Sequence, residues 1–118
     1  MQLTMLHSKI HRARVTASEL HYNGSMGVDV ALIKKAGMIP GQQVDVLNVN
    51  NGERFTTYLI EEEAGSRKFC IYGPAAHKGK VGDTVVIISY AIMDENEAKN
   101  FKPTTLVMNE ENEIEREL

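Results

Sequence analysis

The sequence predicts a mainly β protein, folded as one small closed barrel with a few short helices. Its 118 residues are enough for one hydrophobic core and too few for two, so residues 1–118 form a single domain. The chain divides into six to eight short strand patterns, without the regular alternation of strands and long helices that predicts a parallel sheet. Closing the sheet would leave such short strands without exposed edges.

Residues 3–22 predict two short strands. The first includes residues 10–16, and its alternation places Lys9, His11, Ala13 and Val15 on one face. The second, residues 18–22, ends next to a Gly-Ser pair at positions 24 and 25, where the local sequence favours an ordinary turn.

Asp29 is predicted to cap a helix over residues 30–36, which Gly37 ends. Pro40-Gly41 forms a turn before a strand over residues 43–49. Asn50-Asn51-Gly52 then predicts a hairpin with a type I′ turn, because Asn-Gly tolerates the positive φ angles of that turn.

The returning strand of this hairpin covers residues 54–60, and the acidic run 61–63 is its solvated end. A turn at 64–66 leads to a strand over 68–72, and one helical turn follows at 75–78.

The next predicted strand, residues 84–93, is apolar enough to be buried on both sides. Asp94 caps a short helix that ends near Lys99, and residues 104–108 form the last strand. The acidic residues 109–118 are predicted to be a frayed tail.

Composition narrows the class of function. A net charge of −3 and a pI near 5.8 give no basic field for nucleic acid or an acidic membrane. The longest apolar run, residues 85–88, is too short to span a bilayer, and residues 1–9 do not resemble a signal peptide. The single Cys70 lies in an apolar strand pattern, so we expect a buried thiol and a cytoplasmic protein.

Five short motifs occur in one order along the chain. They are Lys9-Ile10-His11-Arg12, Tyr22-x-Gly24-Ser25, the segment Asn51–Tyr58, the segment Gly73–His77, and Val81-Gly82-Asp83. In this order and spacing the chain resembles the bacterial aspartate 1-decarboxylase family from about residue 5 to about residue 103. These pyruvoyl enzymes make β-alanine for pantothenate, and hence coenzyme A, biosynthesis.

The resemblance implies a six-stranded double-psi β-barrel and a homo-tetramer with active sites at subunit interfaces. It also implies autocatalytic cleavage between Gly24 and Ser25, which converts Ser25 to the pyruvoyl group that forms a Schiff base with L-aspartate. Pyridoxal phosphate is not needed, and the sequence has no Gly-rich phosphate cradle. The four histidines lack the clustered spacing of a metal site, so no metal is expected.

The resemblance also assigns roles to single residues. It makes Tyr58 the proton donor and Thr57 a contact of the substrate that also assists cleavage. Its other substrate-binding residues are Lys9, Arg54, Gly73, Pro74 and Ala75. Arg54 and Tyr58 share one face of the predicted strand, so Thr57 joins them only if the strand twists or the site lies between subunits.

The chain departs from the family pattern at Tyr72 and Pro74, where the family usually has Asn and Ala. Three alternatives therefore remain open at the level of sequence: an aspartate decarboxylase, a pyruvoyl decarboxylase of another small amino acid, and a non-cleaving β-barrel that binds or regulates. The sequence also leaves open whether an accessory factor assists maturation.

Overall fold

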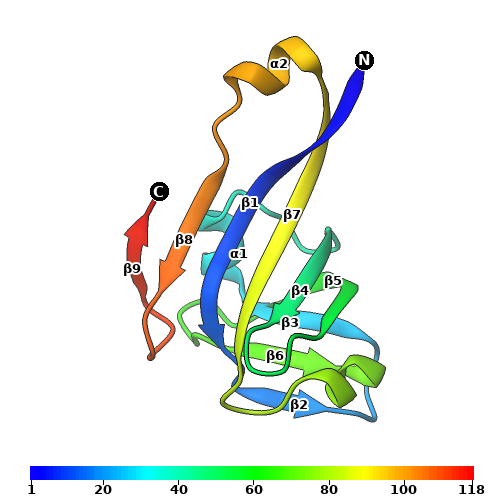
Figure 1. The fold of residues 1–118 in the computed structure, drawn as a ribbon. Helices are drawn as coiled ribbons and strands as arrows, with labels where there is room; N and C mark the ends of the chain where they lie inside the picture. The colour runs from blue at the N-terminus through cyan, green and yellow to red at the C-terminus, as the bar shows by residue number, and fades with distance from the viewer.

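The computed structural model describes residues 1–118 and confirms a mainly β fold with few short helices (Figure 1). All nine strands belong to one sheet, in the order β2-β6-β3-β5-β4-β7-β1-β8-β9. The strands are β1 (Gln2–Arg14), β2 (Ala17–Glu19), β3 (Ser25–Asp29), β4 (Gln43–Asn48), β5 (Arg54–Glu62), β6 (Phe69–Tyr72), β7 (Thr84–Asp94), β8 (Thr104–Met108) and β9 (Ile114–Glu117). The helices are α1 (Val30–Lys35), α2 (Glu95–Asn100) and the 3₁₀ helix η1 (Gly73–Lys78).

The β1–β2 segment wraps the sheet around its core. Only Val15 and Thr16 separate the two strands, so one stretch of chain pairs with β7 through β1 and with β6 through β2. The Val15 amide donates to Asp83 at 2.9 Å and the Thr16 amide to Phe69 at 2.8 Å. Parallel pairs, β2 with β6 and β3 with β5, alternate with antiparallel ones and produce crossed connections. The arrangement agrees with the predicted small barrel.

Buried aliphatic side chains from the barrel strands form one core. Ile10, Ala13 and Val15 of the first segment belong to it, whereas Lys9 and His11 are only half-buried. The predicted single face is therefore wrong. A bulge at Arg12, whose φ is +68°, adds one residue and shifts the alternation.

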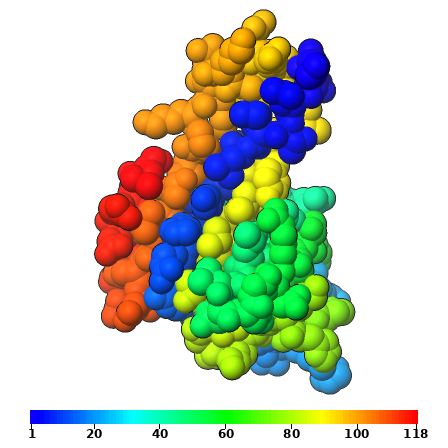
Figure 2. All heavy atoms as spheres, viewed as in Figure 1, coloured from blue at the N-terminus to red at the C-terminus, as the bar shows by residue number.

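The ladder between β1 and β7 is longer than the barrel and forms an arm that carries α2 (Figure 1). The space-filling view shows this arm projecting from the body of the molecule (Figure 2). Residues at the start of β7 are buried on both sides, but Ile92 in the arm is 70% exposed. The prediction of complete burial holds only for the barrel half of β7. None of the helices is long and apolar enough to cross a membrane.

Asp29 caps α1 as predicted, and its side chain does more than the cap requires. It accepts a hydrogen bond from the Ala31 amide at 2.9 Å, and others from the amides of Gly65 at 3.1 Å and Arg67 at 2.8 Å. Asp29 therefore also fixes the turn between β5 and β6. Its own strand, β3, was not predicted, because five residues that begin at a Gly-Ser pair resemble a turn; pairing with both β5 and β6 makes it a strand.

The hairpin between β4 and β5 forms as predicted, but its turn is not type I′. Gly52 has a φ of +75°, whereas Asn51 does not have a positive φ. Asparagine side chains hold the turn instead: Asn48 Oδ1 accepts from the Asn50 amide and Asn51 Oδ1 from the Glu53 amide, both at 2.9 Å.

The predicted frayed tail is wrong, because β9 pairs with β8. Asn112, which is 4% exposed, anchors the turn before β9. Its Oδ1 accepts from the Arg14 amide at 2.7 Å, and its Nδ2 donates to the carbonyls of Arg14 at 2.9 Å and Arg67 at 3.1 Å. The sequence hides this strand because the side chains of an edge strand are mostly exposed and charged.

Candidate active site

The peptide bond between Gly24 and Ser25 lies where the loop after β2 enters β3. Ser25 is 1% exposed and pairs with Tyr72 of β6. Its hydroxyl donates a hydrogen bond to the carbonyl of Asn23 at 3.0 Å, so it is directed toward the chain that precedes it. The Ser25 hydroxyl is therefore buried and lies close to the backbone on the N-terminal side of the Gly24–Ser25 bond.

Gly24 forms part of the wall of a cavity of about 440 Å³, within the range of small-molecule sites. The cavity brings together five residues of the predicted site, which are Gly24, Thr57, Tyr58, Pro74 and Ala75. The remaining lining residues are Phe55, Thr56, Tyr72 and Lys78. Of these four, only Tyr72 drew attention in the sequence, as a departure from the family pattern. Lys78 ends η1 and gave no comparable indication.

Thr57 and Tyr58 reach this cavity from opposite faces of β5. Thr57 lies on the face of the buried Phe55 and Leu59, while Tyr58 is 42% exposed on the other face. Pairing with β3 begins only at Leu59, so the preceding residues of β5 have no strand neighbour on that side. The cavity occupies this unpaired edge, which both faces can reach. The two residues therefore meet within one chain, without the strand twist or subunit boundary considered from sequence.

Gly73 brings the loop before η1 against the Gly24–Ser25 bond. Its φ is +80°, and a Cβ there would lie 2.6 Å from Gly24 Cα and 2.8 Å from Gly24 N. Both contacts are with backbone atoms, which cannot rotate away. Only glycine fits this close approach.

Arg54 does not line the cavity. Its guanidinium donates to Asp45 Oδ2 at 2.9 Å and to the Tyr90 hydroxyl at 2.8 Å, and Thr56 donates to the other oxygen of Asp45 at 2.6 Å. The hydrogen bond from Thr56 chiefly lowers the pKa of Asp45, and the hydrogen bond and charge of Arg54 lower it further. The hydrogen bond to Asp45 in turn is the main cause of the raised pKa of Arg54. The guanidinium is thus bound on the outer face of the sheet.

Lys9 is also separate from the cavity within one chain. It pairs with Ile88 of β7, which pairs with Asp45 of β4, which pairs with Thr56 of β5. Three strand spacings of about 4.8 Å place its Cα about 14 Å from that of Thr56. The structure therefore brings neither of the two predicted cationic contacts of the substrate into the cavity of its own chain.

The Tyr72 side chain makes two specific contacts. Its hydroxyl donates to Glu62 Oε2 at 2.8 Å, and its ring lies 4.6 Å from that of Tyr22. Burial chiefly, and then the neighbouring Cys70 and Glu62, raise the pKa of Tyr72, so it keeps its proton at neutral pH. Glu62 was predicted to be a solvated strand end; it is half-buried, its backbone pairs with Asp29 of β3, and its side chain accepts this hydrogen bond.

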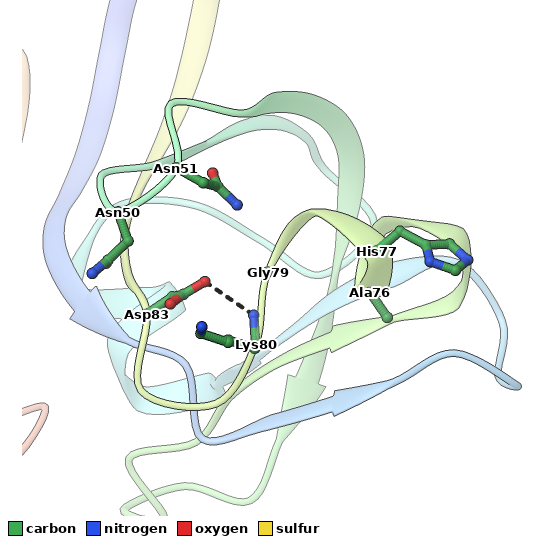
Figure 3. A pocket seen from close by; sticks show the side chains of 7 residues that line it. All are labelled: Asn50, Asn51, Ala76, His77, Gly79, Lys80 and Asp83. Carbon is green, nitrogen blue, oxygen red and sulfur yellow. Dashed lines mark hydrogen bonds between the residues drawn. The ribbon is translucent and has the colours of Figure 1, made fainter.

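A second, polar cavity of about 220 Å³ lies between the β4–β5 turn and the loop before β7 (Figure 3). Asp83 is 5% exposed there and accepts from Asn48 Nδ2 at 2.8 Å and the Lys80 amide at 3.1 Å. Burial alone would raise the pKa of Asp83, but these hydrogen bonds outweigh it and the pKa is lowered. Figure 3 shows His77 on the opposite side of this cavity. The cluster fastens two loops together.

No group of three or more His, Cys, Asp or Glu side chains in the structure could hold a metal ion. Cys70 is buried, as its strand pattern predicted.

Comparison with known proteins points in one direction. The sequence profile of the aspartate decarboxylase family matches residues 1–115. The aspartate 1-decarboxylase of Thermoanaerobacter pseudethanolicus is 53% identical over 112 residues, which cover 95% of this chain and 96% of that protein. The aspartate 1-decarboxylase of Syntrophus aciditrophicus is 51% identical over 114 residues, covering 97% and 98%, and that of Maricaulis maris is 48% identical over 114 residues, covering 97% and 94%.

Proposed function

Because the chain belongs to the aspartate decarboxylase family, we propose that it converts L-aspartate to β-alanine and carbon dioxide with a pyruvoyl group made from its own Ser25. One observation carries the proposal. The Gly24–Ser25 bond lies at the wall of a cavity that Thr57 and Tyr58 also line. β-Alanine formed in this way would serve pantothenate synthesis.

Self-cleavage begins at the Ser25 hydroxyl. Its oxygen attacks the carbonyl carbon of Gly24, the C–N bond breaks, and the amine takes the proton, leaving an ester. Loss of the proton on Cα of Ser25 then breaks the bond between Cβ and the ester oxygen, and Gly24 leaves as a carboxylate. The dehydroalanine that remains takes up one water and loses one ammonia to give the pyruvoyl group at position 25. Gly24 suits the first step because no side chain shields its carbonyl.

The cavity fits a pyruvoyl group at position 25, since Gly24 already lines it and the tight approach of Gly73 leaves no side chain in the way. The group supplies a carbonyl that condenses with the amine of the substrate and accepts the electron pair left when carbon dioxide departs. We assign to Tyr58, which lines this cavity, the delivery of a proton to the substrate carbon. Thr57 and the loop of Gly73, Pro74 and Ala75 bind the remainder of the substrate.

The positions of Lys9 and Arg54 support assembly as a homo-tetramer with sites between subunits. Both are cations suited to a carboxylate, and neither lines the cavity of its own chain. A neighbouring protomer would bring Lys9 to the open side of the cavity. Arg54 would reach it by turning away from Asp45, because the guanidinium is half-exposed and an ion pair with a solvated partner is weak.

Intact-mass spectrometry of the purified protein during incubation tests the proposal. The expected products are a fragment ending at Gly24 and a larger fragment lighter by one ammonia than a chain beginning with serine. Ser25→Ala is the control and should stay whole. The matured protein should then form β-alanine from L-aspartate and outpace L-glutamate and other small amino acids. A persistent single mass for the wild-type protein, or no β-alanine after cleavage, would refute the proposal.

A further inference from the structure

The loop that carries the scissile bond crosses the end of one strand. β6 lies between β2 and β3, and its last residue, Tyr72, pairs with Glu19 of β2 on one side and Ser25 of β3 on the other. Residues 20–24 therefore connect Glu19 to Ser25, the two residues that pair with Tyr72 on its opposite sides. The two flanking strands are about 9.6 Å apart, twice the usual spacing, and Tyr72 is the support beneath this crossing.

The loop has few other anchors. None of the backbone hydrogen bonds outside the regular elements involves residues 20–24. Its contacts are the Ser25 hydroxyl on Asn23, the backbone of Gly24 against Gly73, and the ring of Tyr22 on the ring of Tyr72. Among these, only the Tyr22–Tyr72 contact joins a side chain of the loop to a neighbouring strand.

Tyr72 is itself held across β3. Its hydroxyl reaches Glu62 on β5, and the two side chains pass over Gly27 of β3. A Cβ at Gly27 would collide with the Glu62 carboxylate and lie 2.8 Å from the Tyr72 ring. Because Gly27 has no Cβ, the side chains of Tyr72 and Glu62 can lie across β3. The strands β6, β3 and β5 together therefore fix the Tyr72 ring, against which Tyr22 packs.

From this geometry we infer that Tyr72 is a positioning residue for self-cleavage, held by Glu62 over Gly27 and acting through Tyr22. The ladder fixes Ser25 on one side of the scissile bond, and the ring contact fixes Tyr22 on the other. The pair thereby holds the Gly24 carbonyl within reach of the Ser25 hydroxyl. This inference rests on the proposed function, and it concerns the uncleaved precursor rather than the turnover of aspartate.

The test is the first-order rate of cleavage of freshly purified precursor, followed by intact mass. Tyr22→Leu and Tyr72→Leu each remove the ring contact and should slow cleavage by about tenfold or more. The double variant should be no slower than the slower single variant, because both remove the same contact. Tyr22→Phe keeps both rings and should cleave near the wild-type rate. Tyr72→Phe also keeps the rings but loses the hydrogen bond to Glu62, so its rate should fall between those of the wild-type protein and Tyr72→Leu. Gly27→Ala, which displaces the Tyr72–Glu62 pair from its place over β3, should slow cleavage as well.

A loss of stability must be separated from a loss of position. Each substitution is therefore also made in the Ser25→Ala background, where urea unfolding of the uncleaved chain is measured. Asn112→Ala is the matched control, since it destabilises the fold far from the scissile bond. The inference is overturned if Asn112→Ala slows cleavage as much as a ring variant of equal stability. Additive effects in the double variant, or wild-type rates in both leucine variants, overturn it too. Absence of cleavage in the wild-type protein is a separate outcome, because it would refute the proposed function together with this inference.

Discussion

Substitution of Gly73 by alanine measures how closely the loop before η1 constrains the scissile bond. The new Cβ would lie 2.6 Å from Gly24 Cα, and ordinary contact begins at 3.4 Å, so the two backbones must separate by about 0.8 Å. The φ of +80° adds a cost of about 1–2 kcal/mol for a residue with a side chain. Overpacking against backbone adds about 1–3 kcal/mol more.

Gly65 provides a matched control, because its φ is +82° and a Cβ there meets nothing within 4 Å. Gly65→Ala should cost only the backbone term of about 1–2 kcal/mol. Gly73→Ala should cost about 1–3 kcal/mol beyond that, measured by urea unfolding in the Ser25→Ala background. A displacement near 1 Å at a reacting bond is worth up to about 100-fold in rate, so Gly73→Ala should cleave far more slowly than Gly65→Ala.

Equal unfolding midpoints and equal cleavage rates for the two alanine variants would refute this reasoning. They would mean that the loop moves aside freely and that its contact with Gly24 does not hold the scissile bond in place.

Three further predictions concern other parts of the chain. Tyr58→Phe should cleave normally and lose about 100-fold or more in β-alanine formation, measured on fully cleaved protein, because it removes only the proton donor; equal turnover would exclude that role. Asn112→Ala should lower the free energy of unfolding by about 2 kcal/mol in urea, since it removes three hydrogen bonds of a buried side chain to the backbone of Arg14 and Arg67. Asp83 has a lowered pKa, so its stabilising contribution is complete above the unfolded pKa of about 3.9 and is lost as pH falls through the folded value. Asp83→Ala should therefore flatten the acid limb of a plot of unfolding midpoint against pH, and an unchanged limb would contradict the assignment.

Local sequence predicted those parts of the fold that depend on local chemistry. Asp29 and Asp94 cap helices as expected because a cap is made within a few residues of chain. The strand β9 pairs with its sequence neighbour β8 and was missed because its side chains are mostly exposed and charged. The strand β3 was missed because its hydrogen bonds come from β5 and β6, which lie far away in sequence. The bulge at Arg12 was missed for the same reason, since nothing in the sequence marks where a ladder loses its register.

The candidate site shows the same division. The Gly24-Ser25 pair and the residues at 57, 58, 74 and 75 were recognised by motif, and the structure brings Gly24 and the latter four around one cavity. The partnership of Tyr72 with Glu62 and Tyr22 could not be predicted, because it depends on three strands lying side by side and on a missing Cβ at Gly27. Lys9 and Arg54 remain predictions, since neither lines the cavity of its own chain.

The place of β1 in the sheet gives self-cleavage a lasting effect on folding. β1 pairs with β7 on one side and β8 on the other, so the fragment that ends at Gly24 stays in the molecule when the chain is cut. The precursor folds with β1 tethered, at the high effective concentration of a segment in the same chain. The mature protein, once unfolded, must recover β1 from solution, so closure of its barrel depends on protein concentration, whereas closure of the barrel of a precursor protomer does not. Maturation therefore changes how the protein can refold: a barrel that first closed from one chain must close again from two.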